Sequence, residues 1–406
     1  MVLINEIKKY SEKETISEIK KNELLIFLEN GFPTIHDEEW KYTSLKKIIS
    51  EEYTINSIGK TISEKKIDIN SLGFLHKIIF IDGILISKPE VKGITISGYS
   101  EFKNTSSESI LKLNYALAKN GYTISVDENA IIKVPIEILF LNTVESNFMQ
   151  YRNILTVGKN AEIKFIEKIQ NIDCDISFVN SFTQINCGSN SKLEFNKVQN
   201  NTSKSRLIDS MNIQQKKDSV CNINTIIFGG DFIRNNLSFE QNGTNSESNM
   251  NGVSVLNNNQ LADNHTFVDH KSPNCTSNEM YKGVYLDKSK GIFNGKIMVR
   301  ENSQKIDAFQ ANNTLLLSEY ATIYSKPQLE IYADDVKCSH GCTIGQLDQD
   351  ALFYMRSRGI GLQEAKAVLT YAFASEAINN ITIEEVKLLA KKLLSEKLNV
   401  NLDLTL

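Results

Sequence analysis

One short segment of this chain occurs twice, and the second copy begins 30 residues after the first. The first copy covers residues 157–165, Val-Gly-Lys-Asn-Ala-Glu-Ile-Lys-Phe, and the second covers residues 187–195, Cys-Gly-Ser-Asn-Ser-Lys-Leu-Glu-Phe. A weaker third copy follows at residues 218–223. A repeat of roughly 20 to 50 residues that carries strand and turn signals, without a helical pattern, is typical of a β-solenoid.

Within each copy, apolar residues occupy one position and the second position after it. Such side chains point to the same side of a strand. The Gly-x-Asn corners between strands supply residues that tolerate a left-handed backbone. The alternative is an antiparallel sandwich with an accidental repeat, which the scarcity of Asn-Gly hairpin turns disfavours. The pattern predicts a mainly β protein with a right-handed parallel β-helix over residues 121–346, in which six side chains point inward: Ile163, Phe165, Leu193, Phe195, Cys221 and Ile223.

Before the solenoid, residues 1–120 are expected to form a mixed helical and α/β region. The motif Ser11-x-x-Glu14 matches a capping box that opens a helix, and Gly31 is expected to end that helix. The same region carries two further signals, which are two short strands about a turn at residues 78–86 and a short helix at residues 111–119.

After the solenoid, residues 347–406 are expected to form a C-terminal helical domain of three helices. Asp348 can cap the first helix, which runs to about Ser357, and the second covers about residues 363–379. The motif Thr382-x-x-Glu385 matches a capping box for the third helix. Such an appendage packs partly on the solenoid. It could also cap the end of the solenoid or present a groove to a partner, and the periodicity favours the cap.

Charge and composition narrow the class of protein. The formal net charge is −4 and charges of both signs are mixed along the chain, so no basic surface for nucleic acid is expected. No signal peptide is recognisable, and no apolar run approaches the roughly 18 residues of a membrane helix. We therefore expect a soluble, cytoplasmic protein that binds neither nucleic acid nor membrane. Its six cysteines are then expected to stay free, with Cys187 and Cys221 in the core.

Cys338, His340 and Cys342 alternate with other residues near the end of the predicted solenoid. On an extended strand the three side chains share one face, and thiolate and imidazole ligands suit iron, zinc or copper(I). Three such ligands would leave a position open for a second chain. The alternative is a strand end with buried cysteines and a hydrogen-bonded histidine, where Gly341 turns Cys342 away.

A second group of polar residues resembles a metal site at first sight: Asp263, His265, Asp269 and His270. On one strand, however, residues 265 and 270 point to opposite faces. We therefore interpret this group as a structural polar ladder or a turn.

Several segments of the chain resemble the SufD family, the iron–sulfur cluster assembly scaffolds within the SufB/SufD superfamily. The hallmark is residues 328–341, which end in Cys338-Ser339-His340-Gly341, together with their continuation to residue 360. Shorter matching segments are residues 37–43, 281–284, 293–297 and 310–318. The resemblance runs from about residue 30 through the C-terminal helices and is looser between residues 45 and 260.

This resemblance implies a non-catalytic scaffold subunit that works beside partners. Members of the family pair with a SufB-type paralogue through their β-helices and bind the ABC ATPase SufC through their C-terminal helices. The nascent cluster is thought to form at the SufB–SufD interface, where the family residues correspond to His340 and Cys338. Cys342 departs from the family pattern, in which a small residue is usual. Ser339 stands where SufB proteins carry an acidic residue, which favours SufD over SufB.

From this resemblance we expect His340 and Cys338 to bind iron or a cluster transiently at a partner interface, with no cofactor held tightly by the isolated chain. One short helix is expected to dock the ATPase, because it combines the bulky and cationic side chains Phe353, Tyr354, Arg356 and Arg358. A homodimer of the isolated chain is left open. The alternative function is a β-helical polysaccharide-processing enzyme, which rests on fold analogy alone.

Overall fold

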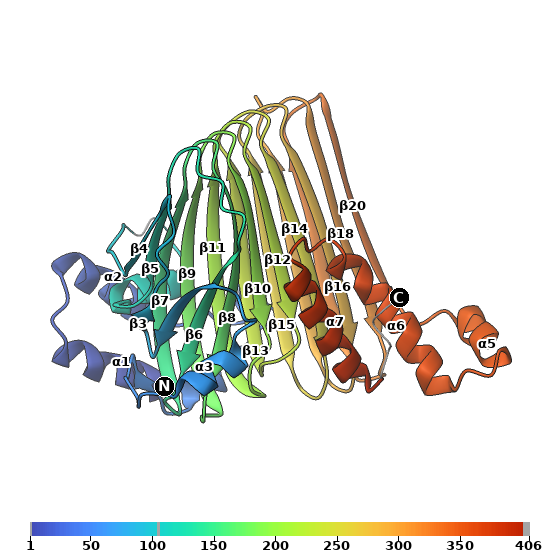
Figure 1. Cartoon of the computed structure of the whole chain (residues 1–406), viewed down its shortest axis with the longest axis horizontal. Helices are drawn as coiled ribbons and strands as arrows, with labels where there is room; N and C mark the ends of the chain where they lie inside the picture. The colour runs from blue at the N-terminus through green and yellow to red at the C-terminus, as the bar shows by residue number, and fades with distance from the viewer. Residues whose placement is uncertain (1, 104–105, 401–406) are drawn as a thin grey trace.

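A solenoid with two facing β-sheets forms the centre of the computed structural model, which describes residues 2–103 and 106–400 (Figure 1). Sheet A contains, in chain order, β1 (Thr54–Ile55), β4 (Ile94–Gly98), β5 (Tyr122–Val126), β7 (Asn147–Val157), β9 (Ile176–Cys187), β11 (Lys204–Gln215), β13 (Phe232–Gln241), β15 (Leu261–His270), β17 (Lys290–Val299) and β19 (Thr322–Ile331). Sheet B contains β2 (His76–Ile81), β3 (Ile84–Ser87), β6 (Ile136–Asn142), β8 (Glu162–Asn171), β10 (Lys192–Gln199), β12 (Val220–Ile227), β14 (Glu247–Leu256), β16 (Thr276–Tyr285), β18 (Ile306–Leu316) and β20 (Val336–Gly345).

Successive coils stack in parallel register, as the repeat predicts. In sheet B, β10 lies between β8 and β12, and all three strands run in the same direction. The inward residues therefore form two columns, Ile163–Leu193–Cys221 and Phe165–Phe195–Ile223, and all six are buried in one apolar core. Cys187 is buried in the same core. The predicted parallel β-helix is confirmed, and the antiparallel sandwich is wrong.

The corners of the coils use residues in the left-handed backbone region. Asn160 and Asn190 follow the repeated glycines and have φ angles of 57° and 56°. Asparagine tolerates this region better than most residues, because its short polar side chain can hydrogen-bond locally. The Nδ2 of Asn190 donates to the Oδ1 of Asn160 at 3.0 Å, and the Nδ2 of Asn160 donates to Asn129 at 2.8 Å. The corners are thus linked from coil to coil.

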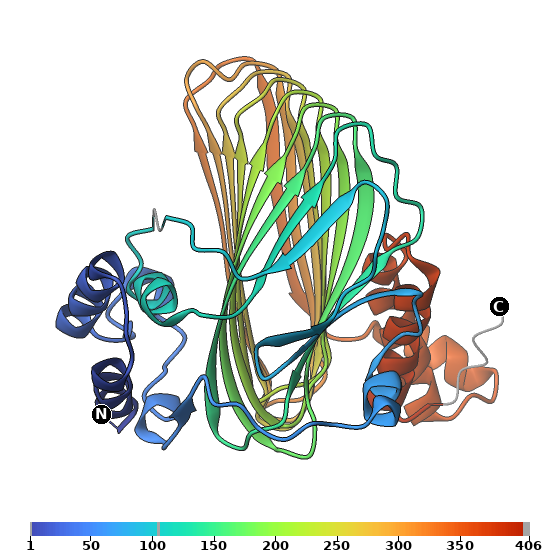
Figure 2. The same ribbon diagram turned by 60° about the vertical axis from the view of Figure 1, so that its left-hand side comes forward.

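The N-terminal region packs mainly on the outer face of sheet A (Figure 2). An apolar cluster joins Leu24, Phe27 and Leu113 of this region to Phe148 and Phe178 of the sheet. Its helices are α1 (Val2–Lys13), α2 (Glu18–Asn30), α3 (Glu64–Asn70) and α4 (Ser109–Leu117), with short 3₁₀ turns η1 (Glu38–Trp40) and η2 (Ile48–Ser50). The predicted short helix near residue 111 and the strand pair β2–β3 are confirmed.

The predicted helix start at Ser11 is wrong. Ser11 lies inside α1, and its Oγ donates to the carbonyl of Lys8 instead of capping a helix. The helix that ends at Gly31 begins after Ser17, whose side chain accepts from the N–H of Lys20. Ser11 is followed three residues later by Glu14, whereas Ser17 is followed by Lys20, so the capping-box pattern pointed to the wrong serine. The helix end at Gly31 is confirmed, with φ at 72°.

The C-terminal helices are α5 (Gln349–Ser357), α6 (Leu362–Ile378) and α7 (Glu384–Leu398). Helices α6 and α7 lie against the outer face of sheet B, opposite the N-terminal layer, and α5 projects away from the solenoid (Figures 1 and 2). Asp348 caps α5 as predicted, with its side chain accepting from two backbone N–H groups. Residues 401–406 lie outside the described part of the chain.

Two expectations about this region are wrong. Thr382 does not cap α7, since the N-cap position falls on Ile383, and the Thr382 hydroxyl bonds to the carboxylate of Glu194 on β10. The helices also leave the end of the solenoid uncapped. The outer face of sheet B carries a strip of apolar side chains, including Val253, Val255 and Val284, and the helices cover this strip. Burying it is favourable by about 25 cal/mol for each Å² of apolar area.

Candidate metal and partner site at the open end of the solenoid

The last coil, made of β19 and β20, is uncovered at the C-terminal end of the solenoid. Among the described strands, β20 pairs only with β18 and β19 pairs only with β17, so each has one unpaired edge. Most residues of β20 are exposed, whereas most of β18 are buried. This coil is where the predicted metal ligands lie.

Cys338, His340 and Cys342 share the inward face of β20, as their alternation predicts. Each stands in register beside a buried interior residue of β18, in the order Ala308, Gln310 and Asn312. The strand continues through Gly341 to Gly345, so the glycine does not turn Cys342 away. All three side chains therefore face the open end of the interior.

The three candidate ligands differ in their surroundings. Cys338 is half-buried against the apolar end of the core, and burial, together with the charge of Asp307, raises the pKa of its thiol. His340 is exposed. Cys342 is also exposed, and its Sγ lies 3.1 Å from the Oγ of Ser325 on β19. His340 and Cys342 are thus open to a group that approaches the last coil.

The two cysteines cannot bind the same metal ion while the strand stays extended. Residues four apart on a strand are separated by about 13 Å, whereas a zinc–thiolate bond is about 2.3 Å long. His340 lies between them and can share an ion with one of them. Across residues 2–103 and 106–400, no three His, Cys, Asp or Glu side chains are placed to hold a metal ion. The coil offers an incomplete ligand set that a second chain would have to complete.

Helix α5 and its C-cap residue Arg358 expose the four residues that we predicted to bind a partner. Phe353 and Tyr354 are 75% and 60% exposed, and the guanidinium of Arg358 lies 5.2 Å from the centre of the Tyr354 ring. Arg356 is exposed as well. The opposite side of the helix is anchored by Leu352, which packs with Leu315, Leu347 and Ala365. The packing of Leu352 holds the helix on the protein, and its other side exposes aromatic and cationic side chains to solvent.

Comparison with known proteins shows the family. The family model described as "SUF system FeS cluster assembly, SufBD core domain" matches residues 140–373, which is more than half of the chain. The iron–sulfur cluster assembly protein SufD of Escherichia coli (strain K12) is 31% identical over 375 residues, which cover 89% of this chain and 88% of that protein. The chain belongs to the SufBD family of iron–sulfur cluster assembly proteins. The resemblance to SufD is confirmed.

Two further relatives are similar to this chain over most of their length. An iron–sulfur cluster assembly SufBD family protein of Synechocystis is 27% identical, over 87% of this chain and 85% of that protein. The chloroplastic protein ABCI7 of Arabidopsis thaliana is 26% identical, over 92% of this chain and 84% of that protein. None of the helices in the described part of this SufD-type chain is long and apolar enough to cross a membrane.

His265 belongs to an ion network that attaches the N-terminal region to the solenoid of this SufBD family protein. Its Nε2 lies 2.8 Å from Asp263 and its Nδ1 lies 3.1 Å from Glu39 of η1. Arg234 lies 2.5 Å from Asp263 and stacks on the ring of Trp40 at 3.9 Å. Burial opposes the charge of His265, but the two carboxylates outweigh it and raise the pKa of His265.

His270 points to the other face of the same strand, as predicted. It is fully buried in the interior, where its Nε2 lies 3.0 Å from the Oγ of Ser277. Burial lowers the pKa of His270 to about 4. The two histidines thus have separate partners on opposite faces of β15. This supports a structural role for the polar residues 263–270, as expected, and not a shared metal site. The contact of His265 with Glu39 was missed, because no local pattern links residues so distant in sequence.

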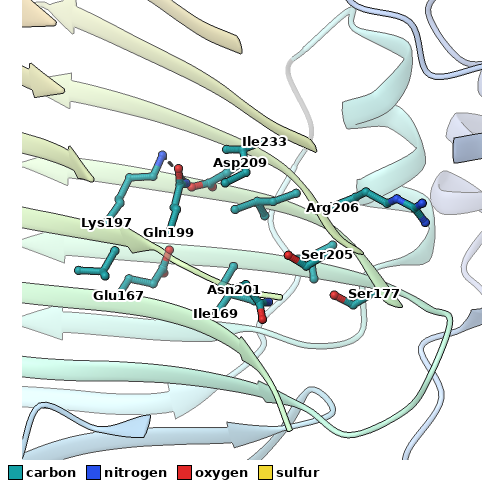
Figure 3. A pocket seen from close by; sticks show the side chains of 13 residues that line it. Glu167, Ile169, Ser177, Lys197, Gln199, Asn201, Ser205, Arg206, Asp209 and Ile233 are labelled. Atoms are coloured by element: carbon teal, nitrogen blue, oxygen red, sulfur yellow. Dashed lines mark ion pairs between the residues drawn. The ribbon is translucent and has the colours of Figure 1, made fainter. Parts of the chain in front are cut away.

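A second buried polar group lies inside the solenoid and was also missed (Figure 3). The Nζ of Lys197 lies 2.7 Å from the Oδ2 of Asp209 across the interior and donates to Asn235 at 2.9 Å. Burial and the nearby charge of Asp209 raise the pKa of Glu167 to about 8. Glu167 and Lys197 follow the inward residues Phe165 and Phe195 by two positions, so continuing the alternation would have placed both inside.

Proposed function

We propose that this SufD-type chain is a non-catalytic scaffold subunit of a cytoplasmic SUF complex. In this proposal it pairs with a SufB-type paralogue through the open end of its solenoid and docks a SufC-type ABC ATPase with its C-terminal helices. His340 and Cys338 bind iron or a nascent cluster at the interface with the SufB-type paralogue. The single observation that carries the proposal is the uncovered last coil, which exposes His340 beside two unpaired strand edges.

The chemistry of the open end supports pairing with another β-helix. Unpaired strand edges carry free N–H and C=O groups that can form hydrogen bonds with another chain, and natural proteins usually protect them. Large apolar side chains are exposed on the same last coils, a feature that marks interaction surfaces. They are Phe309, Tyr320, Ile331, Tyr332 and Ile344. A second copy of the chain could use these edges as well, so we also propose a homodimer when the paralogue is absent.

The incomplete ligand set supports transient binding of metal and not a permanently bound ion. One histidine and one cysteine supply too few ligands for the four-coordinate or cluster sites that hold metal tightly. In the proposal, the isolated chain therefore holds no cofactor firmly, and iron or a cluster is cargo that the assembled interface retains. Membership of the SufBD family, whose relatives are named as assembly proteins, favours this scaffold over a polysaccharide-processing enzyme.

A pull-down with a substituted last coil tests the proposed pairing. Ile344 is 52% exposed at the open end, and Ile131 is 63% exposed near the N-terminal end of the solenoid. The wild-type chain should recover both a SufB-type paralogue and a SufC-type ATPase. Ile344→Lys should weaken recovery of the paralogue by about 30-fold or more, as expected for a central interface residue, and should keep the ATPase.

The control Ile131→Lys makes the same change at the other end and should retain both partners. If the wild-type chain recovers neither partner, the proposed function is wrong. If Ile344→Lys and Ile131→Lys bind the paralogue equally well, the open end is not the interface.

A further inference from the structure

A column of inward side chains leads from the apolar interior to His340. From β8 onward, the residues in register from strand to strand are Phe165, Phe195, Ile223 and Met250, followed by Glu279, Gln310 and His340. The change from apolar to polar residues occurs only in the last three coils. Polar groups inside a solenoid are costly unless they are hydrogen-bonded, so this stretch calls for a function.

Gln310 is held in this column from two sides. It is fully buried, and its Nε2 donates to the Oε2 of the buried Glu279 at 2.7 Å. Across the interior, Gly295 leaves room for the amide, since a Cβ at residue 295 would lie 2.2 Å from Nε2. The amide nitrogen is thereby directed toward Glu279, away from the open end.

The amide oxygen of Gln310 remains available for a hydrogen bond with His340. Within the described residues, the Oε1 of Gln310 has no hydrogen-bond partner although it is buried. A buried acceptor without a partner is unfavourable. The neighbouring residue in the column is His340, on a strand roughly 4.8 Å away. Its ring is exposed and can turn without displacing core side chains.

We propose that Gln310 is a positioning residue for His340, and this proposal rests on the proposed role of His340 at the cluster. The Oε1 of Gln310 accepts a hydrogen bond from one ring N–H of His340. That bond selects a single tautomer and leaves the lone pair of the other ring nitrogen directed to the interface. Histidines that bind metals usually donate their second ring nitrogen to such an acceptor, and the acceptor sets both ring orientation and ligand strength.

Ring-nitrogen NMR of the full chain, labelled with ¹⁵N at its five histidines, tests the hydrogen bond directly. The His340 signals are assigned by their loss in His340→Ala. In the wild-type chain they should report one tautomer, and Gln310→Met, which removes the acceptor at similar length, should give a mixture. Thr314→Val is the matched control, because Thr314 is a buried inward residue of the same strand. It should leave the His340 signals unchanged.

Cluster yield in the complex with its partners provides the second readout. Gln310→Met should lower the yield about 10-fold to 100-fold, the usual effect of losing such an acceptor, while Thr314→Val should not. A wild-type His340 that samples both tautomers as free imidazole does would overturn the inference, even if Gln310→Met failed to fold. A lower yield without a tautomer change would overturn it too, because Gln310 would then act only on packing. If His340→Ala leaves the yield intact, the proposed function fails, whereas the tautomer result still decides the hydrogen bond.

Discussion

Single carboxyl groups inside the solenoid set how the stability of this protein should respond to pH. Glu167 and Glu279 are buried, and burial raises their pKa values to about 8 and about 7. In the unfolded chain a glutamate has a pKa of about 4.3. Both groups therefore bind protons more tightly in the folded state. Their contribution to stability is complete below the unfolded pKa and is lost as the pH rises through the folded values.

The first prediction follows for Glu167. The free energy of unfolding of the wild-type chain should fall between about pH 5 and pH 8, with at most about 1.4 kcal/mol per pH unit from each such group. Glu167→Gln should remove the fall above about pH 7 and make it less steep below pH 7, where Glu279 still contributes. Urea denaturation at several pH values measures this. The control Glu162→Gln removes a carboxylate from β8 at a position outside the interior. Equal pH profiles for wild type and Glu167→Gln would contradict the assignment.

Among the elements, η1 is held to the solenoid by the ion network of His265. Glu39 lies on η1, and Asp263 and Arg234 complete the network from the outer face of sheet A. Because the pKa of His265 is raised in the folded state, its contribution is present at low pH and is lost as the pH rises through the raised value.

The second prediction concerns this attachment. At pH 6, His265→Gln should speed hydrogen exchange of residues 37–43 by about 10-fold to 100-fold, since hydrogen bonds to charged groups contribute about 1.5 to 3 kcal/mol. At pH 9 the difference from wild type should shrink. His36→Gln changes an exposed histidine of the same region and serves as the control. A uniform increase across the whole solenoid would show general destabilisation instead.

Helix α5 carries the third prediction. Replacing Arg356 and Arg358 together by glutamate should lower affinity for the SufC-type ATPase by at least about tenfold, because exposed arginines beside aromatics are frequent interface anchors. Thermal unfolding should stay unchanged, as both side chains are exposed. The double change Lys391→Glu and Lys392→Glu on α7 alters charge equally and should not affect binding. Unchanged affinity of the arginine variant would place the docking surface elsewhere.

Helix boundaries could be predicted from the sequence where neighbouring residues alone determine them. Residues 349–357 begin after Asp348 and end before Gly359, and both signals were recognisable. Ser11 and Thr382 failed as caps because each hydroxyl found another partner, the carbonyl of Lys8 and the carboxylate of Glu194. A capping motif cannot show whether a tertiary contact will compete for the same hydroxyl.

For the whole molecule, the spacing of Val157–Phe165 and Cys187–Phe195 predicted the solenoid, because coil follows coil with the same inward pair. Packing of the C-terminal helices on the solenoid was expected, but the face that they cover could not be predicted in this way. It depends on apolar residues such as Val253 and Val284 on the outer face of sheet B, which lie far from the helices in sequence. The shared face of Cys338, His340 and Cys342 followed from strand periodicity, whereas their exposure follows from the uncapped end.

The open end gives the molecule its proposed role, since it places an incomplete ligand set where another solenoid can stack. Cluster formation by the reconstituted complex that contains His340→Ala tests this claim most directly. Ser339→Ala is the control, because Ser339 is exposed on the outward face of the same strand. The His340→Ala complex should assemble and hydrolyse ATP normally but lose cluster formation, while the Ser339→Ala complex should retain all three properties. A fully assembled His340→Ala complex with an undiminished cluster yield would contradict the account.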